Sequence, residues 1–111
     1  MIKVIVGKLE QLQERRAVIV RAEGEEIAVF KCSDGSLFAI ENRCPHKHGK
    51  LSEGMVCGQV VYCPLHDWRI DLAHGQALAP DKGCVRTYPV EVDEGSGEVV
   101  VFIQPVTREA S

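Results

Sequence analysis

Two short boxes of cysteine, proline and histidine constrain this chain more than any other feature. The first box is Cys44-Pro45-His46, the second is Cys63-Pro64-Leu65-His66, and residues 47–62 separate them. Each box supplies one thiolate and one imidazole, whereas a typical zinc finger pairs Cys with Cys and His with His. Mixed boxes suit a site with two inequivalent metal ions, in which both cysteines hold one ion and both histidines hold the other.

Two other interpretations of the boxes remain open. Zn²⁺ accepts two cysteines and two histidines in a tetrahedral site, so a zinc module is possible. The four residues could also be unrelated, but four metal-binding side chains in two turn-rich boxes are improbable by chance in a chain with four histidines. The prolines, the spacing and the continuation Leu65-His66-Asp67-Trp68 favour an iron–sulfur cluster over zinc.

Composition narrows the class of function. A chain of 111 residues with 45% hydrophobic content is expected to be one domain, residues 1–111, with its own core. A formal net charge of -3 predicts neither nucleic-acid binding nor a polybasic membrane anchor. The longest apolar runs, such as Val99–Ile103, are far shorter than the roughly 18 residues of a spanning helix. The first residues lack a signal-peptide pattern. We therefore expect a cytoplasmic protein.

The remaining cysteines and histidines are expected to be structural. The chain has five cysteines, and an odd number argues against a secreted disulfide framework. Cys32, Cys57 and Cys84 have no nearby histidine, so we expect small, half-buried core residues. His48 and His74 are expected to be exposed loop residues rather than metal ligands.

Short apolar segments separated by glycine-containing turns, such as Asp34-Gly35 before residues 37–41, predict an all-β fold. The expected strands are residues 2–6, 17–22, 27–31, 37–41, 55–57, 60–62, 69–72, 76–78, 88–92 and 98–103. Strands of this length at roughly 8–12-residue spacing are typical of an antiparallel sandwich or barrel. We also expect a helical turn within residues 8–13, a frayed tail over residues 104–111, and Tyr88 and Phe102 in the core of the last hairpin.

The boxes and their surroundings resemble the Rieske [2Fe–2S] domain family. This resemblance implies an ISP-type antiparallel fold with a small cluster-binding subdomain over about residues 42–76. It implies one Rieske-type [2Fe–2S] cluster per chain, with two histidines replacing two cysteines on one iron. The implied ligands are Cys44, His46, Cys63 and His66.

The same resemblance suggests a low reduction potential. High-potential members of the family have an extra cysteine in each box, joined as a disulfide, and a serine that donates to the cluster. Here Gly49 and Leu65 stand at the cysteine positions, and Asp67-Trp68 stand where Gly-Ser would be. The expected potential is therefore roughly −150 mV to near zero. Trp68 is expected to pack under the cluster loops.

Longer stretches are similar to the small subunit of assimilatory nitrite reductase [NAD(P)H]. They are Asn42–Lys47, Leu51–Gly54, Cys63–Trp68 and Ala79–Tyr88. The similarity implies a large partner subunit that carries FAD, a [4Fe–4S] cluster and sirohaem and reduces nitrite to ammonium during nitrate assimilation. This chain would be the non-catalytic, electron-carrying subunit of that oxidoreductase. The alternative is a Rieske-type ferredoxin of a ring-hydroxylating dioxygenase, a class that usually has C-T-H in its first box.

The chain departs from the nitrite reductase pattern at two positions. His48 stands where that family commonly has glycine, and Lys50 stands where it has proline. Without a proline ring to fix φ, the loop is expected to be looser at Lys50. After His66 the chain has a single histidine, His74, too few for the two-histidine, one-carboxylate iron site of an oxygenase. The chain alone is therefore expected to be an electron carrier.

Overall fold

The computed structural model describes residues 2–12, 16–22, 24–44, 49–64, 68–79 and 83–103. The strands are β1 Ile2–Lys8, β2 Ala17–Ala22, β3 Glu25–Lys31, β4 Leu37–Glu41, β5 Met55–Cys57, β6 Val60–Tyr62, β7 Arg69–Asp71, β8 Gln76–Ala77, β9 Thr87–Tyr88, β10 Val90–Val92 and β11 Glu98–Ile103. The described helices are two 3₁₀ turns, η1 Leu9–Gln11 and η2 Leu51–Glu53. The predicted all-β class is confirmed, and so is the helical turn after β1.

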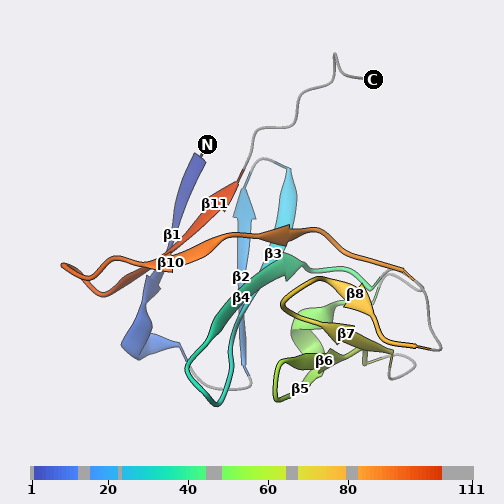
Figure 1. Ribbon diagram of the computed structural model, residues 1–111. Helices are drawn as coiled ribbons and strands as arrows, with labels where there is room; N and C mark the ends of the chain where they lie inside the picture. Colours follow the sequence, from blue (N-terminus) through green and yellow to red (C-terminus); the bar gives the residue numbers. More distant parts are fainter. Residues whose placement is uncertain are drawn as a thin grey trace.

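The strands form three antiparallel sheets. Their strand orders are β1-β11-β10, β2-β3-β4-β9 and β5-β6-β7-β8. Figure 1 shows the β2-β3-β4-β9 sheet between the other two. We call it the central sheet, and we call β5-β6-β7-β8 the small sheet. The strands of the small sheet lie between residues 55 and 77.

The central sheet is buried on both faces, and β3 shows this best. Its residues Ile27, Ala28, Val29 and Phe30 are all 0% exposed. Successive side chains of a strand point to opposite faces. Ala28 and Phe30 pack toward the small sheet, while Ile27 and Val29 pack toward β1 and β11. A strand with two buried faces needs a continuous apolar run, which is what this segment has.

Two hydrophobic cores lie on the two faces of the central sheet. The cysteine-side core faces the small sheet and consists of Ala28, Phe30, Cys32, Ile40, Cys44, Leu51, Val56, Val61, Cys63, Ile70, Leu72 and Val85. The opposite core consists of Leu12, Val20, Ile27, Val29, Ala39, Tyr88, Val99, Val101 and Ile103. Both candidate ligand cysteines therefore belong to one core, the one between the central and small sheets.

The turn between β3 and β4 follows from its sequence. The Ser36 amide donates to Asp34 Oδ1 at 2.9 Å, and the Cys32 amide donates to the Ser36 carbonyl at 2.8 Å. Gly35 has φ +91°, a conformation that side chains with a Cβ rarely adopt. An Asp-Gly pair between apolar runs supplies both requirements of this hairpin, as expected.

The last predicted strand segment differs from the structure. Residues 88–92 were expected to form one strand, but Pro89 divides them into β9, which pairs with β4, and β10, which pairs with β11. Proline has no amide N–H for a ladder, so the chain can change sheets there. Tyr88 is buried as expected. Phe102 is only half-buried, because it alternates with the buried Val101 and Ile103 on β11.

The two ends of the described chain are paired with each other. Ile2 of β1 lies opposite Ile103 of β11 in an antiparallel ladder that continues to Lys8 and Glu98. This sheet lies on the face of the central sheet opposite the small sheet (Figure 1). Among the described residues, no helix has the length and apolar character that crossing a membrane requires.

Candidate metal centre

The structure brings the two predicted ligand cysteines into one buried environment. Cys44 follows β4 after two residues, and Cys63 directly follows β6. Both side chains are 0% exposed and belong to the cysteine-side core. Trp68 is partly buried and packs against the same core. Two thiols that lie 19 positions apart in sequence therefore belong to the same hydrophobic core.

Each cysteine opens a loop that is closed in the same way. The Cys44 amide donates to the Gly49 carbonyl at 2.7 Å, and the Cys63 amide donates to the Trp68 carbonyl at 2.7 Å. Both bonds join a cysteine to the residue five positions later. We call residues 44–49 the first loop and residues 63–68 the second loop. Equal closure gives the two cysteines equivalent positions at the start of their loops.

The predicted histidine ligands lie outside the described residues. His46 belongs to the undescribed part of the first loop, and His66 to that of the second. His48 and Asp67 are outside the description as well. Among the described residues, no group of three or more His, Cys, Asp or Glu side chains is placed to hold a metal ion. The four-ligand set therefore stays a prediction, of which the structure positions the cysteine half.

The donor chemistry of that half fits a Rieske cluster. Thiolates are the soft ligands that iron–sulfur clusters use. A buried thiol without a metal or a redox role is common in cores, so burial alone is weak support. Cys44 and Cys63 differ from ordinary core cysteines in that both also begin hydrogen-bonded loops carrying a histidine two or three positions later.

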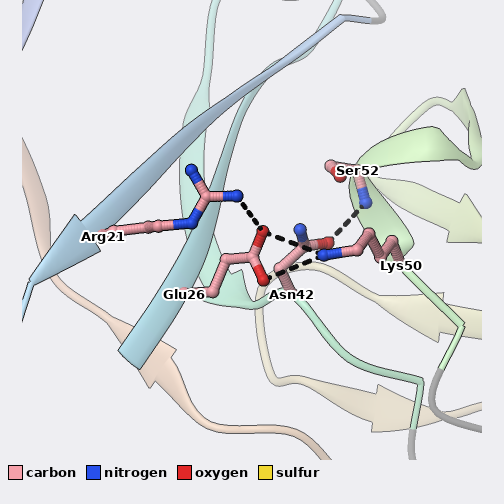
Figure 2. Close-up of polar contacts among 5 residues, drawn as sticks. All are labelled: Arg21, Glu26, Asn42, Lys50 and Ser52. Atoms are coloured by element: carbon pink, nitrogen blue, oxygen red, sulfur yellow. Dashed lines mark hydrogen bonds and ion pairs between the residues drawn. The ribbon is translucent and has the colours of Figure 1, made fainter. Parts of the chain in front are cut away.

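Polar contacts hold the residues on either side of the first loop, and one of them is to β3 of the central sheet (Figure 2). The Ser52 amide donates to Asn42 Oδ1 at 2.7 Å, and Lys50 Nζ lies 3.1 Å from Glu26 Oε1. The hydrogen bond from Lys50 holds the pKa of the Glu26 carboxyl below its ordinary value. Lys50 has φ −84° and ψ 111°, an extended conformation. The position at which the nitrite reductase pattern commonly has proline is therefore occupied by Lys50, whose side chain is bound to Glu26 of β3.

Sequence analysis did not single out Glu26 or Asn42 as residues of the site. Asn42 was noted only as the first residue of the Asn42–Lys47 stretch. It is a buried polar residue, 5% exposed, and its side-chain oxygen accepts a hydrogen bond from the Ser52 amide, after the loop. No local pattern could have identified their roles, because their partners lie ten and 24 positions away.

A glycine after η2 lies directly against the end of β6, the strand that precedes the second loop. Gly54 follows η2, and a Cβ placed on it would lie 2.1 Å from the carbonyl oxygen of Tyr62, the residue before Cys63. This is well inside any real contact, so only glycine fits. The chain that leaves the first loop therefore runs directly against the strand end that begins the second loop.

The other cysteines and His74 fall into two groups. Cys32 is buried, 1% exposed, and burial raises the pKa of its thiol. Cys57 and Cys84 are exposed, so the expectation of half-buried core residues was wrong for them. Both lie at the edges of the small sheet, where one face meets solvent. His74 is exposed as expected, and its Nδ1 lies 2.8 Å from Asp71 Oδ2, which lowers the Asp71 pKa.

Comparisons with known proteins agree on one family. A family model described as the Rieske [2Fe-2S] domain matches residues 2–89. The anthranilate 1,2-dioxygenase ferredoxin subunit of Burkholderia cepacia is 38% identical over 86% of this chain and 89% of its own length.

Two solved structures represent the two classes of partner. The ferredoxin of carbazole 1,9a-dioxygenase from Nocardioides aromaticivorans IC177 is 32% identical, with a TM-score of 0.81 over 91% of this chain and 97% of that chain. A Mycobacterium tuberculosis protein described as an NADH-dependent nitrite reductase small subunit is 25% identical, with a TM-score of 0.83 over 90% of this chain and 93% of that chain.

Proposed function

The chain belongs to the Rieske [2Fe–2S] domain family, and from that premise we propose that it is the electron-transfer subunit of an assimilatory NAD(P)H nitrite reductase. Members of this family carry a Rieske-type cluster, which exchanges one electron at a time. The observation that best supports the electron-transfer part of the proposal is the pair of buried cysteines that open equally closed loops in one core.

We assign the cluster ligands as the sequence predicts. Cys44 and Cys63 would hold one iron, and His46 and His66 would hold the other. The cysteine-side core around the two thiols excludes water from the sulfur half of the site. The two loops begin in the core, at Cys44 and Cys63, so the histidines further along each loop are the ligands we expect nearer to solvent.

The partner is inferred from two stretches that resemble the nitrite reductase small subunit. Leu51–Gly54 forms η2 and the close approach of Gly54 to Tyr62. Gly83–Tyr88 joins the small sheet to the central sheet: the Val85 amide donates to the Gly75 carbonyl at 2.7 Å, and β9 pairs with β4. Both stretches lie between the central sheet and the small sheet. The structural neighbour from Mycobacterium tuberculosis supports this assignment.

On this assignment the chain supplies electron transfer and its partner supplies catalysis. The large subunit would bind NAD(P)H and carry FAD, a [4Fe–4S] cluster and sirohaem. The residues of this chain would hold the cluster, shield its sulfur side and position the loops. The chain would therefore be an electron carrier with no catalytic residue of its own.

The second candidate is a ferredoxin that serves a ring-hydroxylating dioxygenase. The identity of 38% to the anthranilate 1,2-dioxygenase ferredoxin subunit favours it. The fold does not separate the two candidates, because TM-scores of 0.83 and 0.81 are nearly equal. The first box separates them better, since Cys44-Pro45-His46 has proline where the ferredoxins usually have threonine.

The cofactor and the partner need separate tests. Anaerobically purified protein should contain about two irons and two labile sulfides per chain, and its reduced form should give a rhombic Rieske electron paramagnetic resonance signal. Cys44→Ser and Cys63→Ser should each abolish that signal, whereas Cys84→Ser should retain it. A colourless protein that contains zinc would overturn the electron-transfer assignment.

The partner is tested in the source organism. Deleting the gene should prevent growth on nitrite as sole nitrogen source and leave growth on ammonium unchanged. Wild-type growth on nitrite, combined with lost growth on an aromatic compound as carbon source, would replace nitrite reductase with the dioxygenase candidate. Complementation with the Cys84→Ser gene controls for effects of the deletion on neighbouring genes.

A further inference from the structure

The first loop is flanked by two short segments that we call its stems, residues 42–43 before it and residues 50–52 after it. A hydrogen bond joins the two stems to each other. Asn42 precedes the loop and Ser52 follows it. The Ser52 amide donates to Asn42 Oδ1 at 2.7 Å, outside the bond from the Cys44 amide to the Gly49 carbonyl. The loop is therefore closed at two levels before any contact with the rest of the fold is considered.

Glu26 of β3 contacts both stems, and Figure 2 shows its carboxylate facing Lys50. Its carbonyl accepts a hydrogen bond from the Asn42 amide at 3.0 Å. Its carboxylate lies 3.1 and 3.2 Å from Lys50 Nζ, so both oxygens face the ammonium group. Residues 27–30 of the same strand are fully buried. The two stems are thus attached to a strand whose next four residues are completely buried.

We propose that Glu26 is a positioning residue for the cluster: by binding Lys50 it holds the two stems of the first loop together and slows loss of the cluster. This inference rests on the proposed assignment of Cys44 and His46 as ligands. The inference concerns a position at which this chain departs from the nitrite reductase pattern, since Lys50 stands where a proline is common. Here an ion pair does what the ring of a proline does elsewhere, restricting the loop.

The ion pair acts on the loop more than on the whole fold. The side chains of Glu26 and Lys50 are 26% and 49% exposed, and pairs with this exposure contribute little to global stability. Loops open locally at a lower free-energy cost than the core unfolds, so a weak contact changes their opening measurably. The inference therefore predicts faster loop opening without a lower melting temperature.

The first test measures how fast a chelator removes iron from the loaded protein. Glu26→Gln and Lys50→Met should each accelerate the loss about two- to fivefold, the factor that corresponds to the free energy of a partly exposed pair. The melting temperature of the cluster-free protein should not change. Lys50→Arg keeps a cation for the Glu26 carboxylate and should restore the wild-type rate.

The reduction potential separates positioning from simple charge. Loss of the Lys50 charge should lower the potential, because a nearby cation favours the more negative reduced cluster, and loss of the Glu26 charge should raise it. The two variants should therefore shift the potential in opposite directions but accelerate iron loss in the same direction. Opposite effects on iron loss as well would overturn the proposal.

Arg21 supplies a matched control. Its Nη2 lies 3.2 Å from the same Glu26 carboxylate, but Arg21 is on β2 and its side chain is 73% exposed. Arg21→Met removes a cation from the carboxylate and leaves the Lys50 contact in place. Iron loss should match that of the wild type. Acceleration equal to that of Lys50→Met would overturn the proposal.

Hydrogen exchange in the cluster-free protein tests the inference independently of the ligand assignment. The Ser52 and Cys44 amides should exchange faster in Glu26→Gln and Lys50→Met than in Arg21→Met. If the wild-type chain bound no cluster, the proposed function would fail while this measurement would still test the loop. Unchanged exchange in both variants would overturn the inference and leave the proposed function standing.

Discussion

Individual thiols in this protein have very different surroundings. Cys32, Cys44 and Cys63 are at most 1% exposed, whereas Cys57 and Cys84 are exposed on the small sheet. A thiol reacts as the thiolate, so burial protects it both by access and, for Cys32, by a raised pKa.

We expect two fast-reacting thiols when the native, cluster-free protein is treated with iodoacetamide. Mass spectrometry of the labelled peptides should assign them to Cys57 and Cys84. The Cys57→Ser/Cys84→Ser double variant should lose the fast phase altogether. Rapid labelling of Cys44 or Cys63 would contradict the buried positions of the candidate ligands.

Asp34 makes the β3–β4 turn sensitive to acid. Hydrogen bonds from the Ser36 side chain, and then from its amide, hold the Asp34 pKa below its ordinary value of 3.8. Because the folded-state pKa is depressed, the stabilisation is complete above the ordinary value and is lost as the pH falls through the folded-state value.

A carboxyl-detected NMR titration should therefore place Asp34 below the pKa of a model peptide. The melting temperature of the wild type should fall in the acid range more steeply than that of Asp34→Asn, which keeps an acceptor oxygen but has no titrating group. Parallel curves for the two proteins would contradict this role of Asp34.

The sequence was sufficient to predict the burial or exposure of some residues but not of others. Burial of Tyr88 and exposure of His74 follow from strand alternation and turn composition, which are local. The exposure of Cys57 does not, because it depends on the small sheet having one uncovered face. The pairing of Glu26 with Lys50 joins residues 24 positions apart, and no spacing rule predicts it.

Among the elements, the contact between η2 and the end of β6 is the most demanding. Gly54→Ala would place a methyl group 2.1 Å from the Tyr62 carbonyl oxygen, and the backbone would have to separate. We expect a loss of about 3 kcal/mol in the free energy of unfolding, at the upper end of common single-substitution effects. Cluster content should fall as well, since Tyr62 precedes Cys63.

Chemical denaturation and iron analysis measure these two effects. Gly95→Ala is the matched control, because its added Cβ would meet only Asp93 Oδ1 at 3.4 Å, an ordinary contact distance. That variant should unfold within about 1 kcal/mol of the wild type. Equal stability of the two alanine variants would show that the loops do not need the close approach.

Hairpins were the most predictable elements because their signals are local. The Asp34-Gly35 turn and the apolar run Val99–Ile103 were sufficient to predict β4 and the last strand. The division at Pro89 was not predicted, because an apolar run does not say which strand it will pair with. The choice between β4 and β11 is made by tertiary packing, which overrides local β-propensity.

At the scale of the whole molecule, the two cores share the central sheet. Ala28 and Phe30 belong to one core and Ile27 and Val29 to the other, all on β3. We therefore expect residues 1–111 to unfold as a single domain in one transition. Tryptophan fluorescence reports the cysteine-side core through Trp68, and far-UV circular dichroism reports all the strands. The two melting curves of the cluster-free protein should coincide, and separated midpoints would indicate two domains.

The reduction potential is a property of the complete site. The boxes have neither the extra cysteines nor the serine that high-potential relatives possess, so we expect roughly −150 mV to near zero. Protein-film voltammetry measures it directly. A value of about +200 mV or more would contradict the interpretation of Gly49, Leu65 and Trp68, since that region of the range belongs to the high-potential class.

The pairing of β1 with β11 also fixes how the molecule can be attached to something else. Ile2 and Ile103 lie opposite each other, on the face of the central sheet away from the cysteine-side core. A tether joined at Ile2 or at Ile103 would therefore start on the side of the central sheet that is away from Cys44 and Cys63. An electrode linker could be attached at either position and would start on the side away from both thiols in each case.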